Sequence, residues 1–334
     1  MNILGIETSC DETAAAVVQN GQKVLSNIIV TSLKEHEKYG GIIPEIASRR
    51  QLECINAIVR EALDHSKLRL KDIDAVAVTS SPGLIGSLLV GISFARALSF
   101  TIRKPLIQVD HIRAHVYANF LVDATSPLLC GEEVDNLPKL PVIGLVVSGG
   151  HTSLYHIKNF HRFQLIGQTL DDAAGEAFDK VARILKLEYP GGPAIDRLAK
   201  TVKQTNLRFK PAELPGTFDF SFSGVKTAVL YHHLQARKDK NLPVAEVAYA
   251  FQKSVVDILI KKSLAACHKY KAKTLVVGGG VAANTCLRKE LIQKGRKEGI
   301  RVFFPPFSFC LDNAAMIAGM GYQSNHLRKK SILN

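Results

Sequence analysis

The pattern of apolar and polar positions near the N-terminus predicts consecutive strands joined by tight turns. Residues 2–7 form a short apolar run that ends in a polar turn, and residues 13–18 form a second run. Asn20-Gly21 then favours a hairpin turn into a third strand over residues 23–30. The chain is therefore expected to begin with a β-hairpin extended by one more strand.

Helical periodicity follows this hairpin. Residues 44–63 are expected to form an amphipathic helix with Leu52, Ile55, Val59 and Ala62 on one face. The elements expected next are a buried strand at 75–78, a helical stretch at 85–100, a strand at 105–109 and a helix that holds His111 and His115. Strands that alternate with helices indicate the α/β class.

The N-terminal pattern returns in the middle of the chain. Strands are predicted over residues 141–147 and 152–157, around a small polar turn. Gly144, Ser148 and Thr152 each lie 139 residues after an identical residue of the first hairpin, namely Gly5, Ser9 and Thr13. A strand at 273–277 that leads into three glycines is the expected counterpart of the strand at 75–78. The sequence therefore predicts an internal duplication.

The length and the repeat together predict two lobes. A chain of 334 residues exceeds the size at which one hydrophobic core stops growing. We expect a first lobe at residues 1–122, to which a C-terminal helix at about 312–325 returns, and a second lobe at 142–311. Residues 123–141 are rich in turn-forming residues and carry three acidic side chains between positions 132 and 135, so they are expected to be a linker or insertion.

The positive charge is concentrated in the last two-fifths of the chain. The net charge is +13, and residues 201–334 carry 22 basic against 8 acidic side chains, whereas the first 200 residues are nearly neutral. Either lysines on solvated faces or a surface for nucleic acid would explain this excess. The basic residues of this stretch include Lys226, Arg237, Lys238, Lys240, Arg288 and Arg328-Lys329-Lys330.

The cysteines and the apolar runs bear on the compartment. The six cysteines include no Cys-x-x-Cys pair, which disfavours zinc ribbons and thioredoxin-type redox sites. The N-terminus has no basic region before an apolar run, so no signal peptide is predicted. No run of about 18 apolar residues is recognised, so no membrane span is predicted. A cytoplasmic protein with reduced cysteines and no membrane partner is expected.

The segment His111-Ile112-Arg113-Ala114-His115 is the first candidate for chemistry. Positions i and i+4 share a helix face, so both imidazoles can reach one metal ion, although this spacing also occurs without a metal. Ile112 stands where a zinc protease carries its glutamate base, which disfavours a metallopeptidase. Asp312 is the candidate third ligand, and its alternative role is to cap the next helix. Two histidines and a carboxylate suit iron or zinc.

Two glycine-rich turns that follow predicted strands are candidates for nucleotide binding. Ser148-Gly149-Gly150-His151 is either a ligand-binding turn or an ordinary hairpin turn. Gly278-Gly279-Gly280 precedes Asn284, which could bind a nucleoside, but the Rossmann spacing is missing. Residues 175–183 are either a solvated helix face or, with Asp196, part of a ribose pocket. The first hairpin turn carries two further acids that could face the same cleft, Asp11 and Glu12.

Nine motifs in one order resemble the universal tRNA adenosine threonylcarbamoyltransferase family over nearly the full chain. They are GIETSCDETA at 5–14, GGIIPEIASR at 40–49, HIRAH at 111–115, VSGGHT at 147–152, GEAFDKVAR at 175–183, YPGGPAIDRLA at 189–199, FSFSGVKTA at 220–228, GGGVAAN at 278–284 and Asp312-Asn313. The resemblance implies an α/β fold of the actin, Hsp70 and sugar-kinase superfamily. Such a fold has two duplicated, ribonuclease H-like lobes with the active-site cleft between them.

The resemblance also implies which residues form the site. His111, His115 and Asp312 match the family's metal ligands for one divalent ion per subunit, with Fe²⁺ favoured and Zn²⁺ as the alternative. The residues that match substrate contacts are Val146, Val147, Ser148, Gly149, Gly150, Asp179, Gly192, Asp196 and Asn284. Asp11 matches a turn residue that is important for transfer, where it either accepts a proton from the attacking amine or shapes the electrostatics of the site.

The implied reaction moves a threonylcarbamoyl group from threonylcarbamoyl-AMP to N6 of adenosine 37 in tRNAs that read codons beginning with adenine, and AMP leaves. The implied partners are the tRNA, a shorter paralogue of the same fold that docks near the helix at 44–63, and a small P-loop ATPase. One rival is an ATP-dependent small-molecule kinase, but the second hairpin turn holds His151 and lacks the acid that a kinase needs. Another rival is a non-catalytic scaffold paralogue, which would be expected to lose the metal ligands.

Overall fold

The chain forms two compact units in the computed structural model, which describes residues 1–124, 137–238 and 243–331. Unit 1 comprises Met1–Pro138 with Pro305–Asn334, and unit 2 comprises Lys139–Phe304. The insertion predicted at 123–141 falls largely on residues 125–136, outside the described residues. The lobe boundaries expected from the sequence stay a prediction.

Unit 1 is built on a six-stranded sheet in the order β5-β4-β1-β2-β3-β6. The antiparallel strands are β1 (Asn2–Glu7), β2 (Glu12–Gln19) and β3 (Lys23–Thr31), as the apolar pattern predicts. Strands β4 (Ala75–Ser81) and β5 (Leu106–Asp110) continue the sheet beside β1 in parallel, and the short β6 (Val122–Asp123) pairs with β3. The central strands are buried on both faces, because helices cover both sides.

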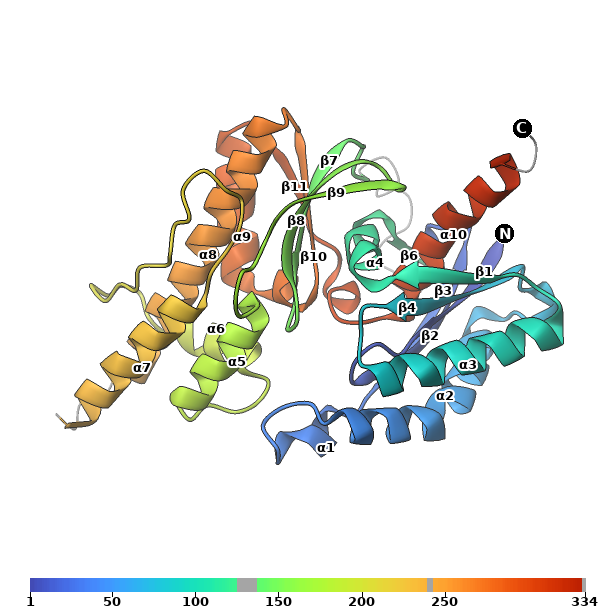
Figure 1. Ribbon diagram of the computed structural model, residues 1–334, viewed down its shortest axis with the longest axis horizontal. Coiled ribbons are helices and arrows are strands. Elements are labelled where there is room, and N and C mark those ends of the chain that lie inside the picture. Colours follow the sequence, from blue (N-terminus) through green and yellow to red (C-terminus); the bar gives the residue numbers. More distant parts are fainter. Residues whose placement is uncertain (125–136, 239–242, 332–334) are drawn as a thin grey trace. The chain divides into compact units, whose positions relative to one another are not determined.

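Helices α2 (Pro44–Ser66) and α3 (Ile85–Ile102) cover one face of this sheet, and α10 (Ala314–Ser331) covers the other (Figure 1). Side chains of α2 and α3 share a core with Leu4, Val17 and Val78 of the sheet. On the opposite face, a Cβ at Gly5 would lie 2.3 Å from the carbonyl oxygen of Ala314. Glycine at this position therefore lets α10 pack directly on β1. Short helices α1 (Leu33–Glu37) and α4 (His111–Tyr117) complete the unit.

One residue of the predicted apolar face of α2 is misplaced. Ile55, Val59 and Ala62 are buried as expected, but Leu52 is 66% exposed. The buried face instead runs through Gln51, one position back, because the helix presents that residue to the β1–β2 turn. Leu52 lies beside Leu89 of α3, which is also exposed.

By length and composition, α3 is the one helix among the described residues that could cross a membrane, which corrects the expectation that no such segment exists. It connects β4 to β5 and packs against β4, as a crossover helix of a parallel α/β unit does.

Unit 2 contains a five-stranded sheet in the order β11-β10-β7-β8-β9. Its strands are β7 (Val142–Val147), β8 (Thr152–Asn159), β9 (Arg162–Gln168), β10 (Thr274–Gly278) and β11 (Arg301–Phe303). Its helices are α5 (Ala174–Ile184), α6 (Gly191–Ala199), α7 (Ser223–Lys238), α8 (Val244–Lys269) and α9 (Thr285–Lys297). A short 3₁₀ turn at Gly280–Ala283 joins β10 to α9.

The two sheets confirm the duplication that the sequence predicts. In each unit a hairpin pairs through its first strand with a later parallel strand, so β7, β8 and β10 occupy the places of β1, β2 and β4. The pairing registers of the two hairpins also agree. Leu4 pairs with Val17 in unit 1, and the residues 139 positions later, Ile143 and His156, pair with each other in unit 2. The fold is thus a duplicated α/β architecture.

Candidate active site

Two histidines of unit 1 lie on one face of a short helix that starts at the end of β5. The Asp110 carboxylate caps this helix by accepting a hydrogen bond from the backbone N–H of Arg113 at 2.9 Å. His111 and His115 then follow one turn apart, with ring centroids 4.6 Å apart, and both are buried. The i and i+4 spacing therefore does bring the two imidazoles together.

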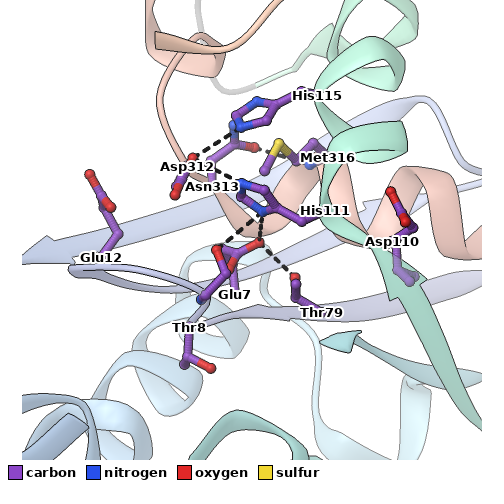
Figure 2. A network of polar contacts seen from close by, with 12 residues as sticks. Glu7, Thr8, Glu12, Thr79, Asp110, His111, His115, Asp312, Asn313 and Met316 are labelled. Atoms are coloured by element: carbon purple, nitrogen blue, oxygen red, sulfur yellow. Dashed lines mark hydrogen bonds and ion pairs between the residues drawn. The ribbon is translucent and has the colours of Figure 1, made fainter. Parts of the chain in front are cut away.

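Asp312 meets these histidines from the segment that precedes α10 (Figure 2). Its Oδ1 lies 3.1 Å from Nε2 of His115 and 3.5 Å from Nε2 of His111. Asp312 does not cap α10. Asn313 does, because its Oδ1 accepts from the backbone N–H of Met316 at 3.0 Å. The alternative capping role considered for Asp312 is therefore wrong, and its carboxylate faces the histidines.

The donor set fits a divalent metal ion. One ligand atom from each of His111, His115 and Asp312 lies within 4.8 Å of the others. Nδ1 of His115 is buried without a hydrogen-bond partner among the described residues, and its Nε2 makes no hydrogen bond but faces the Asp312 carboxylate, an arrangement that ordinary packing rarely leaves. Two imidazoles and one carboxylate match the preferences of iron and zinc and leave coordination positions for a substrate.

The acidic surroundings determine the proton affinity of His111. Burial lowers the pKa of this imidazole, but the neighbouring carboxylates of Asp312 and Glu7 outweigh burial and raise the pKa to about 9. In the metal-free protein the ring is therefore cationic at neutral pH. Its Nε2 proton has to leave when a metal binds there.

Glu7 is a residue of this site that sequence reasoning missed. Its side chain is fully buried at the end of β1, and its Oε2 lies 3.0 Å from Nδ1 of His111. The signal was available, because a charged residue ends an otherwise apolar strand. The carboxyl ends of β1, β4 and β5 also lie at one edge of the sheet, where His111 begins α4.

The β1–β2 turn places three further ionisable groups near Asp312. Asp11 is buried, and its carboxylate accepts from the hydroxyl of Thr31 at 3.3 Å. Burial, together with Asp312 and Asp11, raises the pKa values of Cys10 and Glu12 well above their usual ranges. The Cys10 thiol is therefore protonated, which excludes it as a thiolate nucleophile.

The side chain of Gln51 fixes this turn from α2. Its Nε2 lies 2.8 Å from the carbonyl oxygen of Cys10, 3.1 Å from that of Glu12 and 3.4 Å from that of Thr8. The backbone N–H of Leu84, just before α3, donates to the carbonyl of Ser9 at 2.8 Å. The turn that carries Asp11 is thus held by α2 and by the start of α3.

The equivalent turn of unit 2 has free space beside its two glycines. The backbone N–H of His151 donates to Oγ of Ser148 across the turn at 3.1 Å. A Cβ added at Gly149 or Gly150 would meet nothing within 4 Å. Packing therefore does not require these glycines, and the space beside them is free. The side chains of Val146 and Val147 are buried in β7, so any ligand contact from them would come from the backbone.

The remaining predicted contacts in unit 2 lie at the starts of α6 and α9 or hydrogen-bond to them. The Asp179 carboxylate accepts from the backbone N–H of Gly191 at the start of α6, and burial raises its pKa. A Cβ at Gly192 would meet nothing within 4 Å. Asp196 and Asn284 are brought close by Thr285, whose hydroxyl donates to Asp196 at 2.9 Å, while Asn284 caps α9.

Two of the basic candidates have partners within unit 2. The ammonium of Lys226 lies 2.6 Å from Asp172, and Nε of Arg288 donates to the carbonyl of Ala282 at 2.7 Å. These side chains are less available to a phosphate than the sequence suggests. The side chains of Arg237, Lys238, Lys240 and residues 328–330 lie outside the described part of the chain.

The duplicated sheets have the α/β fold expected for the actin, Hsp70 and sugar-kinase class, and the His-His-Asp group lies in unit 1. Solved structures show the same fold at low identity. Component A of the (R)-2-hydroxyglutaryl-CoA dehydratase of Acidaminococcus fermentans has a TM-score of 0.54 at 14% identity, covering 98% of this chain and 99% of that one. Full-length HypF in its phosphate- and nucleotide-bound form has a TM-score of 0.63 at 14% identity, covering 98% of this chain and 55% of that one.

The sequence comparisons identify the family. The family model for tRNA N6-adenosine threonylcarbamoyltransferase matches residues 23–319. Relatives of that name in Clostridium botulinum (strain 657 / Type Ba4) and Clostridium beijerinckii are 49% and 48% identical, with 96% of this chain covered and 92% and 91% of theirs. The chain belongs to the tRNA N6-adenosine threonylcarbamoyltransferase family, which confirms the resemblance. It is a transferase of tRNA modification.

Proposed function

We propose that the chain transfers the threonylcarbamoyl group of threonylcarbamoyl-AMP to N6 of adenosine 37, in tRNAs that read codons beginning with adenine. A bond forms between N6 and the carbamoyl carbon, the bond from that carbon to the phosphate oxygen breaks, and N6 loses a proton while AMP leaves. The observation that carries the proposal is the buried convergence of His111, His115 and Asp312 in a member of this family.

His111, His115 and Asp312 would hold one divalent ion, Fe²⁺ by preference and Zn²⁺ as the alternative. Bound there, the ion would supply Lewis-acid polarisation of the acyl group that is transferred. The N6 amine is a weak nucleophile because its lone pair is delocalised into the ring. Positioning of both substrates by this chain's own residues therefore has to provide much of the rate.

The turns of unit 2 would bind the AMP half of the donor. The free space beside Gly149 and Gly150 admits a phosphate to backbone N–H groups, and Val146, Val147 and Ser148 frame the same turn. Gly192 is similarly open at the start of α6, where an anion is favoured. Asp179, Asp196 and Asn284 hold the neighbouring helix starts in place and would contact the nucleoside.

Asp11 would act on the acceptor side of the reaction. Its carboxylate lies on the β1–β2 turn, near the acidic group formed with Glu12 and Asp312. One role is to accept the proton that N6 loses, and the other is to shape the field around the transferred group. The fixation of this turn by Gln51 supports either role, because a base or a fixed charge has to be held in place.

The partners would be a shorter paralogue of the same fold and a small P-loop ATPase, in the cytoplasm. The apolar face shared by α2 and α3 supports a docking surface there. Leu52 of α2 and Leu89 of α3 line the same surface hollow and are exposed at 66% and 58%, which is unusual for large apolar side chains that lie together.

One assay tests the proposal. The chain is incubated with tRNA and threonylcarbamoyl-AMP, alone and with each partner combination, and the digested tRNA is analysed by mass spectrometry for the modified nucleoside. The expected product carries the threonylcarbamoyl mass on adenosine 37, and one AMP is released per nucleoside. Absence of this product under every combination would overturn the proposal, and phosphorylation of a sugar panel with ATP would favour the kinase instead.

A further inference from the structure

Glu7 is a fully buried carboxylate that contacts His111 of the candidate metal site (Figure 2). The contact is with Nδ1, the ring nitrogen that does not face Asp312. Oε1 of Glu7 accepts from the backbone N–H of Ser9 at 2.5 Å, and its Oε2 accepts from the hydroxyl of Thr79 at 2.6 Å. The same Oε2 lies 3.0 Å from Nδ1 of His111. Strands β1 and β4 thus hold the carboxylate, and the carboxylate holds the histidine.

This contact determines which ring nitrogen of His111 faces the site. Glu7 Oε2 and the Ser9 hydroxyl, which lies 3.2 Å away, both contact Nδ1 of His111, and this pair of contacts favours the tautomer in which Nδ1 carries the proton and donates it to Glu7. Nε2 is then the nitrogen whose lone pair is available to a metal. Nε2 is also the atom 3.5 Å from Asp312, on the side where Nε2 of His115 approaches the same carboxylate.

The two histidines differ in this respect. Nδ1 of His115 has no hydrogen-bond partner among the described residues, so no group behind the ring holds that nitrogen as Glu7 holds Nδ1 of His111. The internal repeat adds a second contrast. By the 139-residue offset that the two hairpins share, Val146 takes the place of Glu7 in unit 2. The buried carboxylate therefore belongs only to the copy that carries the candidate metal ligands.

We propose that Glu7 is a positioning residue that fixes the tautomer and the orientation of His111 for metal binding through Nε2. The proposal rests on the metal site of the proposed function. Glu7 is not itself a ligand, because it contacts the ring on the nitrogen opposite the site. A carboxylate behind a ligating histidine raises the basicity of the ring and limits its rotation, and its loss commonly costs 10- to 100-fold in metal affinity.

The test measures Zn²⁺ affinity of the full chain by competition with a chromophoric chelator, without tRNA. Glu7→Gln should weaken the affinity about 10- to 100-fold. The matched control is Glu246→Gln in unit 2, the same glutamate-to-glutamine change at a partly buried carboxylate that accepts the hydroxyl of Thr205 at 2.5 Å. Its Zn²⁺ affinity should equal that of the wild type. Wild-type affinity in Glu7→Gln would overturn the proposal.

A second measurement uses the unaltered chain, so it does not depend on the variant folding. Imidazole ¹⁵N spectra of the Zn²⁺-loaded wild type, assigned with the His111→Gln variant, should show His111 protonated on Nδ1 and zinc-bound through Nε2. Zinc bound through Nδ1 would overturn the proposal. A wild type that binds no zinc would overturn both this proposal and the metal site, whereas zinc bound as expected in an inactive chain would overturn only the proposed function.

Discussion

At the residue scale, the site depends on side chains that are held by specific neighbours. Asn313 takes the capping role at α10, which leaves the adjacent Asp312 carboxylate to face two histidines. Glu7 lies behind His111, and the protonated thiol of Cys10 lies beside Asp312. In the metal-free protein a cationic histidine therefore lies among acidic side chains. A bound divalent ion would supply the positive charge in its place.

Replacing His111 with alanine should remove metal binding and transfer together. The change deletes one of three ligands, so metal content measured by mass spectrometry should fall well below one ion per chain. Transfer should fall on the order of a thousandfold, which corresponds to about 4 kcal/mol of lost transition-state stabilisation. His65→Ala, on the exposed side of α2, is the control and should keep its metal. Full transfer by a verified metal-free variant would exclude the metal from the reaction.

The pKa of His111 predicts how the metal-free protein responds to pH. The pKa rises from an ordinary 6.5 to about 9 on folding, so the folded state binds the proton more tightly than the unfolded state. The resulting stabilisation, on the order of 2–3 kcal/mol, is present below pH 6.5 and is lost as the pH rises through 9. Urea unfolding of the wild type and of His111→Gln should therefore differ most at pH 6.5 and least at pH 9.5. A difference that is independent of pH would contradict this assignment.

At the element scale, the close approach of α10 to β1 connects packing with the site, because Asp312 lies just before α10. Gly5 permits this approach, and Gln51 of α2 holds the β1–β2 turn from the other face of the sheet. The candidate ligand Asp312 and the β1–β2 turn are thus held from opposite faces of one sheet. Displacement of a single helix is enough to change their spacing.

Gly5→Ala tests this support. The added Cβ would lie 2.3 Å from the Ala314 carbonyl, so α10 has to shift, at a cost of about 1–3 kcal/mol. Both the free energy of unfolding and the metal affinity should fall, because Asp312 moves with the helix. Gly41→Ala is the control, since a Cβ there meets nothing within 4 Å, and its stability should stay within about 0.5 kcal/mol of the wild type. Unchanged metal affinity in Gly5→Ala would show that Asp312 is positioned independently of α10.

Local patterns were sufficient to predict most elements of unit 1 and strands β7, β8 and β10 of unit 2. The hairpins, the repeat and the i, i+4 histidines are local signals, and the structure bears them out. The errors concern choices that tertiary contacts decide. Leu52 and Gln51 differ by one helix position, and only the turn that Gln51 meets determines which is buried. Glu7 lies 104 residues from His111, so no local pattern joins them.

At the scale of the whole molecule, the charge is the feature that remains to be assigned. Unit 1 and the start of unit 2 are nearly neutral, and the excess lies after residue 200. Within that stretch Lys226 forms an ion pair with Asp172, and Arg288 donates a hydrogen bond to the carbonyl of Ala282. Arg237, Lys238 and Lys240 are further basic candidates of this stretch, and they are the ones to test for contact with the RNA backbone.

The triple variant Arg237→Gln, Lys238→Gln and Lys240→Gln should bind tRNA more weakly, and its affinity for tRNA should depend less steeply on salt concentration. Each lost phosphate contact reduces the slope of log affinity against log salt by about 0.7 to 0.9, so loss of all three should reduce it by about 2 to 3. Binding of threonylcarbamoyl-AMP should be unchanged, because the donor would bind at the turns of unit 2. The charge-matched control carries glutamine substitutions at three exposed residues of unit 1, Lys23, Arg60 and Lys71. It should keep the wild-type slope of log affinity against log salt. Equal slopes in both variants would mean that the excess charge only solvates the surface, since a basic segment that contacts phosphates has to release counterions when RNA binds.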